Sequence, residues 1–225
     1  MNKNLSIVIP TLGYHSLLES TLQSAAKIQA AEIIVVSPIE DGYFEELFTK
    51  YNCSFLIGPK GRGPALAFGE KNATGDWILF LHSDTVLSPL AASEISTFTH
   101  NPKNIERAAY FTFKQDASDV KSWLLEYLVA LRCLVLAMPY GDQGLLISKK
   151  LYHHLKGFRE DYPMMEDVDF ILKIGRRRLH RFKSPAITSS IRYKNRYLKR
   201  ILRNARCLFL YFAGTSPKEI AKIYE

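Results

Sequence analysis

Short apolar runs alternate with helical patterns along the first half of the chain. Four runs are rich in β-branched residues and have few polar interruptions, as expected of strands buried on both faces. These predicted strands span 5–10, 32–37, 53–58 and 77–83. The segments between them have helical spacing and span 15–29, 42–51 and 64–73. This alternation predicts an α/β fold, with right-handed crossovers and a mostly parallel central sheet covered by helices on both faces.

The pattern becomes less regular after residue 86. We expect strands at 108–113, 144–148 and near 187–193, and helices at about 88–100, at about 118–137, directly after 148 and up to about 177. Two further helices are expected at the end, one at about 196–213 and one opened by Ser216-Pro217. We interpret residues 1–225 as one domain with a nucleotide-binding half (1–86), a second half (87–193) and basic amphipathic C-terminal helices (194–225).

Composition narrows the class of protein. The 225 residues are 47% hydrophobic and 23% charged, which is enough for one sizeable core. The three cysteines are scattered without CxxC spacing, which favours a reducing compartment over a disulfide framework or a structural zinc site. The beginning of the chain has no signal-peptide pattern, and no segment offers the roughly 20 uninterrupted apolar residues of a membrane span. We therefore expect a cytoplasmic protein.

Positive charge is concentrated in the C-terminal third. The net charge is +8, yet the segment from Lys173 to Arg206 holds 13 Lys and Arg residues and no acidic residue. Such a segment indicates an anionic partner, namely phosphates, nucleic acid or a membrane surface, although a solvated basic face is the alternative. No nucleic-acid reading element is recognisable, whereas Leu, Phe and Tyr accompany the basic residues at helical spacing. We favour a peripheral membrane contact at the inner face of the membrane over nucleic acid.

Carboxylates at predicted strand and helix ends are the main candidates for chemistry. The chain has no GxGxxG after its first strand and no GxxxxGK[ST], HExxH or GxSxG motif. Asp84 follows the strand at 77–83, while Glu166 and Asp167 open a helix. One carboxylate can hold a divalent cation whose shell is completed by phosphate oxygens and water, and another can accept a proton from an attacking hydroxyl. Ordinary turn and helix-start roles are the alternatives.

The order of several segments resembles family 2 glycosyltransferases with the GT-A fold. These segments are "IVIPT", "EIIVV", "GRGPALAFGEKNATGDWILFLHSDT", "YGDQGLLISKKLYHHLKGFRED", "PMMEDVDF" and "TSSIRY". The chain is most similar to a small bacterial subgroup whose metal motif begins with His in place of Asp. The resemblance extends from Leu5 to about Tyr224, and its most specific parts are Gly61 to Thr85 and the "MEDVDF" loop.

The resemblance implies a donor site and a metal site. Pro10 and Thr11 match positions that hold the nucleotide's base and ribose. The "HSD" triplet matches the Asp-x-Asp metal motif, so Asp84 would coordinate Mn²⁺ or Mg²⁺ on the donor diphosphate. Ser83 would lie at the donor, and His82 becomes a second candidate metal ligand, with a packing role as its alternative.

Further donor-binding candidates are basic or lie at the end of the second strand. Arg62, between Gly61 and Gly63, would approach the phosphates at a helix N-terminus, although a glycine turn is the alternative. Arg192 of "IRY" would contact the diphosphate. Relatives usually carry an Asp after the second strand that contacts uracil, and Glu40 or Asp41 is the candidate replacement here.

The remaining implied roles concern the acceptor. Asp167, paired with Glu166, matches the general base that deprotonates an acceptor hydroxyl for in-line attack with inversion. Asp142 and Gln143 fall in the acceptor-side region. We therefore expect a metal-assisted, inverting transfer from a nucleotide-diphosphate-sugar to a hydroxyl acceptor of unknown identity, with a lipid-linked acceptor favoured. A sugar nucleotidyltransferase, or a non-catalytic nucleotide- or membrane-binding module with a decayed site, remains the alternative.

Overall fold

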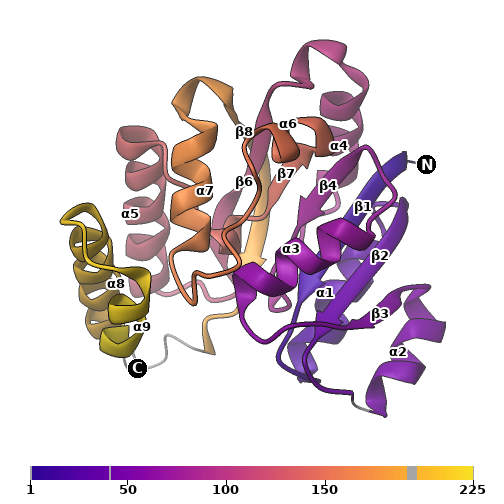
Figure 1. The fold of residues 1–225 in the computed structure, drawn as a ribbon, viewed down its shortest axis with the longest axis horizontal. Coiled ribbons are helices and arrows are strands. Elements are labelled where there is room, and N and C mark those ends of the chain that lie inside the picture. Colours follow the sequence, from indigo (N-terminus) through magenta and orange to yellow (C-terminus); the bar gives the residue numbers. More distant parts are fainter. Residues whose placement is uncertain (1, 41, 192–196, 225) are drawn as a thin grey trace.

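The computed structural model describes residues 2–40, 42–191 and 197–224 as an eight-stranded sheet with helices on both faces (Figure 1). The strand order is β3-β2-β1-β4-β7-β6-β8-β5. The strands are β1 (Asn2–Pro10), β2 (Ala30–Ser37), β3 (Ser54–Ile57), β4 (Trp77–Phe80), β5 (Thr85–Leu87), β6 (Ala108–Gln115), β7 (Leu145–Ser148) and β8 (Leu179–Thr188). The α-helices are α1 (Ser16–Ala26), α2 (Tyr43–Tyr51), α3 (Arg62–Asn72), α4 (Ala91–His100), α5 (Val120–Leu136), α6 (Lys149–His154), α7 (Glu166–Ile174), α8 (Tyr197–Phe212) and α9 (Pro217–Tyr224).

The two faces of the sheet bury alternate residues of each strand. In β1, Leu5, Ile7 and Ile9 pack into a core formed with α1, α2 and α4, while Val8 packs into a second core with α3, α6 and α7. Side chains of successive strand residues point to opposite faces, so both faces must be covered for such an apolar strand to be stable. This explains why the first-half strands read as continuous apolar runs.

The sheet is parallel in its first half and mixed in its second. Strands β3, β2, β1 and β4 pair in parallel, as predicted. Strand β7 is antiparallel to both β4 and β6, whereas β6 and β8 are parallel to each other. The short strand β5, which the sequence pattern did not predict, pairs antiparallel with β8 at the sheet edge. Loops that follow β1 and β4 therefore meet the second half of the chain at one edge of the sheet.

The prediction of a strand near 187–193 was wrong in its position. The strand is β8, Leu179–Thr188, and its buried side chains alternate at Phe182, Ser184, Ala186 and Thr188. Basic residues at the outward positions concealed this alternation in the sequence. The preceding helix α7 ends at Ile174, before the predicted end, because Gly175 adopts φ 74°, a backbone conformation that glycine tolerates.

The C-terminal helices α8 and α9 lie side by side next to α5 (Figure 1). The Ser122 and Tyr197 hydroxyl oxygens, from α5 and α8, are 2.9 Å apart. Among the described residues, no helix is both long and apolar enough to cross a membrane. All three cysteines are free and buried, in agreement with the sequence-based prediction that they form no disulfide framework.

Candidate active site

Two hollows meet at the loop that follows β4. The larger, of about 510 Å³, is lined by Pro10 and Thr11 after β1 and by Ser83. The smaller, of about 160 Å³, is lined by Asp142 and Asp167 and by side chains from the C-terminal helices. Three side chains line both hollows: Arg62, His82 and Asp84. Their position at the boundary is where a group passing from one bound molecule to another would lie.

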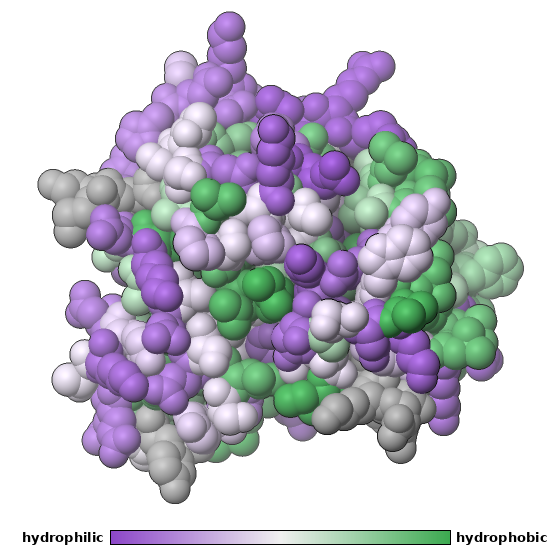
Figure 2. Space-filling model, turned by 180° about the vertical axis from the view of Figure 1, so that it is seen from behind, coloured by the Kyte–Doolittle hydropathy of each residue, from purple (hydrophilic) through white to green (hydrophobic). Residues whose placement is uncertain are grey.

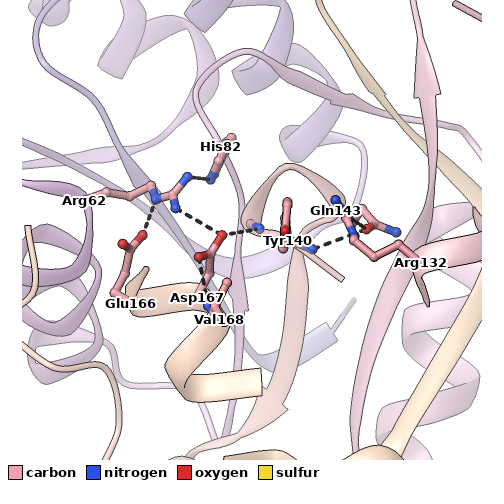
Figure 3. Close-up of polar contacts among 9 residues, drawn as sticks. Arg62, His82, Arg132, Tyr140, Gln143, Glu166, Asp167 and Val168 are labelled. Carbon is pink, nitrogen blue, oxygen red and sulfur yellow. Dashed lines mark hydrogen bonds and ion pairs between the residues drawn. The ribbon is translucent and has the colours of Figure 1, made fainter. Parts of the chain in front are cut away.

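Arg62, the first residue of α3, connects the segments around the boundary (Figure 3). Its Nη2 lies 3.0 Å from Asp167 Oδ2, and its Nε donates to the Glu166 carboxylate. Its Nη1 lies 3.2 Å from His82 Nε2. One guanidinium thus binds both carboxylates of the Glu-Asp pair and the histidine after β4. Such fork-shaped, charge-assisted hydrogen bonds hold their partners in a defined orientation.

The two neighbouring carboxylates of α7 have different electrostatic environments. Glu166 is 1% exposed, and its burial raises its pKa despite the opposing charge of Arg62. Burial also opposes ionisation of Asp167, but the Arg62 guanidinium and the Gly141 amide outweigh it, so the pKa of Asp167 is lowered. The Gly141 N–H donates to Asp167 Oδ2 at 3.0 Å. Asp167 is therefore ionised at neutral pH, as a general base must be.

The backbone before α7 directs this pair into the site. Met165 is the N-cap of the helix and adopts φ 65°, a left-handed backbone conformation that is uncommon for residues other than glycine. The helix then begins with Glu166 and Asp167, whose negative charges are favourable near the positive end of the helix dipole. Backbone strain of this kind is concentrated at functional sites.

The loop carrying Asp84 is fixed from two sides. Thr21 of α1 donates a hydrogen bond to the Ser83 carbonyl at 2.9 Å, and His15 Nε2 lies 3.0 Å from Ser83 Oγ. On the other side, the Ser189 amide donates to the Asp84 carbonyl at 3.4 Å. Asp84 is 5% exposed, so its carboxylate is directed into the protein at the boundary of the hollows and away from bulk solvent.

Gly141 approaches His82 so closely that no larger residue fits. A Cβ atom at Gly141 would lie 2.5 Å from His82 Nε2, well inside van der Waals contact. The same glycine donates its amide to Asp167. The turn at Gly141 therefore helps to place both the histidine and the Glu-Asp pair.

The two predicted acceptor-side residues lie differently: Asp142 lines the smaller hollow, whereas Gln143 lines neither hollow. Burial raises the pKa of Asp142 to about 6, and Arg132 opposes the shift. Gln143 is 2% exposed, its Nε2 donates to the Phe111 carbonyl at 3.1 Å, and its Oε1 accepts from Arg132 Nη2 at 3.1 Å. Gln143 thus anchors the turn that carries Gly141 and Asp142 to Phe111 and Arg132.

Arg132 is a residue that the sequence reasoning did not assign to the site. Its guanidinium lies 3.4 Å from the centre of the Tyr140 ring and its Nε donates to the Met138 carbonyl at 2.9 Å (Figure 3). It therefore supports the turn that carries Asp142. A lone arginine within the apolar run at 123–138 was the available signal, because a charge in such a run needs a specific partner.

Further residues that line the hollows were not predicted from the sequence. Lys60, in the loop before α3, lines the larger hollow, and its place beside Arg62 in a glycine-rich loop was the signal. Arg200 and Asn204 of α8 line the smaller one, which no local pattern indicated. Two predicted donor-binding residues, Asp41 and Arg192, lie outside the described residues.

The side chains at the boundary fit a divalent cation if substrate phosphates supply the rest of its ligands. Among the described residues, no group of three or more His, Cys, Asp and Glu side chains could hold a metal by itself. Mg²⁺ and Mn²⁺ are bound by one or two protein carboxylates when substrate phosphates supply the other ligands. Asp84, buried between the hollows, suits this mode. His82 Nε2 instead faces Arg62, so coordination through that nitrogen requires Arg62 to move.

Solved structures with the same fold include a mannosyltransferase and a glucosyl-3-phosphoglycerate synthase. Residues 1–349 of S. aureus TarS match with a TM-score of 0.62 and 16% identity over 89% of this chain and 63% of that chain. Glucosyl-3-phosphoglycerate synthase from Mycobacterium tuberculosis, in complex with Mn²⁺ and UDP-glucose, matches with a TM-score of 0.58 and 15% identity over 89% of this chain and 77% of that one. The mannosyltransferase PcManGT from Pyrobaculum calidifontis, in complex with GDP-mannose and Mn²⁺, matches with a TM-score of 0.55 and 14% identity over 83% and 56%.

These similarities establish the GT-A fold, and the sequence match establishes the family. The chain spans less than two thirds of the length of the TarS fragment. No curated protein sequence matches this chain significantly. Residues 6–117, which contain β1 to β4 and the loop with Asp84, match the family described as Glycosyl transferase family 2. The chain is therefore a family 2 glycosyltransferase.

Proposed function

We propose that the protein transfers a sugar from a nucleoside-diphosphate-sugar to a hydroxyl acceptor, with inversion at the anomeric carbon and assistance from a divalent metal. The observation that carries this proposal is the boundary between the two hollows, where Arg62, His82 and Asp84 face both. Structures with the same fold contain UDP-GlcNAc, or UDP-glucose with Mn²⁺. The larger hollow is the donor site in this proposal and the smaller one the acceptor site.

The nucleotide lies in the larger hollow, between the ends of β1 and β4. Pro10 and Thr11 form its floor, and the Thr11 amide is bonded to the Val36 carbonyl at 2.8 Å, which holds the end of β1 against β2. Lys60 and Arg62 supply positive charge beside the phosphates, at the N-terminus of α3. A hollow of about 510 Å³ falls within the range of small-molecule sites.

Asp84 holds the metal together with the donor diphosphate. When bound, the cation neutralises charge that develops on the departing diphosphate. The His82 imidazole, in contact with Arg62, positions the guanidinium and would be a second candidate ligand for the metal. Arg62 lines both hollows and can therefore bind the donor on one side and Asp167 on the other.

Asp167 is the general base. The acceptor hydroxyl, bound in the smaller hollow, loses its proton to the Asp167 carboxylate while its oxygen forms a bond to the anomeric carbon. The bond from that carbon to the diphosphate oxygen breaks, and the electron pair leaves with the nucleoside diphosphate. A single in-line displacement inverts the configuration. Glu166 is buried against Arg62 and positions the guanidinium, and Asp142 faces the acceptor.

We favour an acceptor that is linked to a lipid or lies next to the membrane. The basic segment from Lys173 to Arg206 includes α8, which supplies Arg200 and Asn204 to the wall of the acceptor hollow. A peripheral contact of this segment with the inner face of the membrane would bring such an acceptor to the site. In this proposal the enzyme acts in the cytoplasm at the membrane surface and has no role in nucleic-acid binding.

A thermal-shift panel tests the donor proposal. Purified protein is heated with UDP-, GDP-, ADP- and dTDP-sugars, each with and without Mn²⁺, beside the variant Asp84→Asn as the matched control. We expect a rise in Tm for one base, dependent on Mn²⁺ and lost in Asp84→Asn. If no nucleotide-sugar raises the Tm under any condition, the chain is a module with a decayed site and the proposal is rejected.

A further inference from the structure

The outward surface of α5 is apolar or aromatic from Trp123 to Leu136. Its large side chains are 37% to 71% exposed at six successive outward positions: Trp123, Leu124, Tyr127, Leu128, Leu131 and Leu134. No other element among the described residues covers them, since α5 buries only the opposite side against β6 and α8. An exposed apolar patch of this extent on a soluble domain marks an interaction surface.

Apart from Lys121, which is exposed in the first turn, the charged side chains and the serine of α5 point the other way. Ser122 is buried against Tyr197, and Glu126 accepts a hydrogen bond from the Gln115 amide at 2.9 Å. Arg132 is turned inward to Tyr140. The inward side of α5 is apolar too, with Leu125, Val129 and Cys133 buried, whereas a helix on the surface of a soluble domain normally has a polar outward side. The outward surface of α5 is therefore built to contact an apolar phase.

Helix α8 extends this surface with a second apolar row. Leu198, Leu202, Phe209 and Phe212 are 56% to 72% exposed and recur at helical spacing. The space-filling view shows apolar side chains gathered on the side of the molecule where α5 and α8 lie (Figure 2). We call the exposed side chains of these two rows the α5–α8 face.

The charges that border the α5–α8 face are basic. Arg176 donates to the Leu134 carbonyl at 2.9 Å, which holds the triplet Arg176–Arg178 against the C-terminal end of α5. Lys199 and Arg206 are exposed on α8. The acidic residue nearest the start of α5, Asp119, accepts from the Ser122 amide as a helix cap. The border therefore attracts a negatively charged partner.

Aromatic side chains lie at the N-terminal part of the face. The Trp123 and Tyr127 rings are stacked, with centroids 6.1 Å apart and an interplanar angle of 17°. Both are more than half exposed. Tryptophan and tyrosine are enriched where an apolar phase meets a polar one, because each ring has an apolar body and a polar atom.

We propose that the α5–α8 face docks the protein onto an anionic lipid bilayer, with α5 lying in the interface and the basic border on the headgroups. The combination of an apolar helix face, interfacial aromatics and a mostly basic border is that of a helix that lies on a membrane without crossing it. A second copy of the chain would bring two basic borders together, and their repulsion disfavours that occupant.

Docking in this orientation places the acceptor hollow beside the bilayer. One side of α8 carries Leu198 and Leu202 on the docking face, while Arg200 and Asn204 from the same helix line the acceptor hollow. A lipid-linked acceptor could thus reach the hollow along α8. That consequence rests on the proposed transfer function, but the docking itself does not.

Vesicle flotation of the full chain tests the docking. Vesicles of phosphatidylcholine alone are compared with vesicles that also contain phosphatidylglycerol, at low and high salt. We expect binding to the anionic vesicles, weakened by salt, and at least tenfold weaker binding by the double variant Leu124→Glu/Leu131→Glu. The matched control is Leu90→Glu, because Leu90 is 66% exposed before α4, outside the face, and this variant should bind like the wild type.

Several outcomes would overturn the docking. Wild-type protein that stays unbound with anionic vesicles, or a double variant that binds as well as the wild type while melting at the same Tm, would exclude it. A stable dimer in sedimentation that dissociates in the double variant would assign the face to a second copy instead. Asp167→Asn should bind vesicles like the wild type, so failure of the docking and failure of the transfer function are distinguishable.

Discussion

Replacement of Arg62 by methionine removes the only described cation in contact with both carboxylates of the Glu-Asp pair. Methionine keeps much of the side-chain stem but offers no hydrogen bond. Glu166, 1% exposed, is then left buried against apolar neighbours without its partner. We expect Arg62→Met to fold with reduced stability and to lose transfer activity.

The expected loss of stability in Arg62→Met follows from the burial of Arg62 and Glu166. Removing one partner of a fully buried ion pair costs about 3–5 kcal/mol. Arg62 is 36% exposed, so solvent screens part of its charge, and about 2–3 kcal/mol is the better expectation. The loss depends on pH, since a carboxyl whose pKa is raised on folding binds more protons in the folded state. The free energy of unfolding then falls as pH rises, by up to about 1.4 kcal/mol for each unit of pKa difference.

Urea unfolding at pH 5 and pH 8 measures this effect. We expect the stability difference between wild type and Arg62→Met to be larger at pH 8 than at pH 5. The double variant Arg62→Met/Glu166→Gln should recover part of the loss at pH 8, because a neutral amide replaces the buried charge. Equal stability of Arg62→Met and wild type at both values, or a loss that does not change with pH, would refute the role of Arg62 as the counter-ion.

Three other substitutions or treatments follow from the same geometry. Gly141→Ala should lower the turnover number by about tenfold or more, as misplaced site residues do, because its Cβ would lie 2.5 Å from His82 Nε2. Gly42→Ala, where a Cβ meets nothing within 4 Å, is the control, and equal kinetics for both would contradict the expectation. Asp142→Asn should raise the Tm more at pH 8 than at pH 4 in metal-free buffer, because burial raises the pKa of Asp142 to about 6 and stability is lost as it ionises. A pH-independent difference in Tm would disprove that. Chelation with EDTA should abolish donor-induced stabilisation, and Mn²⁺ should restore it in wild type but not in Asp84→Asn; restoration in both would remove Asp84 as the metal ligand.

The sequence predicts the first half of the fold (residues 1–86) well for a physical reason. Strands buried on both faces must be apolar throughout, so β1, β2 and β4 are recognisable as runs, and the residues after them must lie at one sheet edge. Pro10, Thr11 and Asp84 were predicted on that basis and on the family resemblance, and they do line the larger hollow. Asp167, predicted from the resemblance, lines the smaller hollow and contacts Arg62.

Local sequence patterns could not predict the long-range side-chain contacts of the site. The contact between Arg62 and Glu166 joins residues 104 positions apart, so this pairing could not be inferred from spacing. The short strand β5 gave no periodic signal, and the basic outward residues of β8 concealed its alternation. Helix α5 is apolar on both sides, so the pattern of its sequence alone does not specify which side the rest of the fold covers.

The central claim is that Asp167 is the base of a metal-assisted transfer, and a comparison of binding with turnover tests it most directly. With the donor identified by thermal shift, calorimetry in Mn²⁺ measures donor affinity, and release of the nucleoside diphosphate measures turnover. Asp167→Asn should retain donor affinity close to that of the wild type and lose at least about 10²-fold in turnover, the usual contribution of a general base. Undiminished turnover by Asp167→Asn would contradict the account.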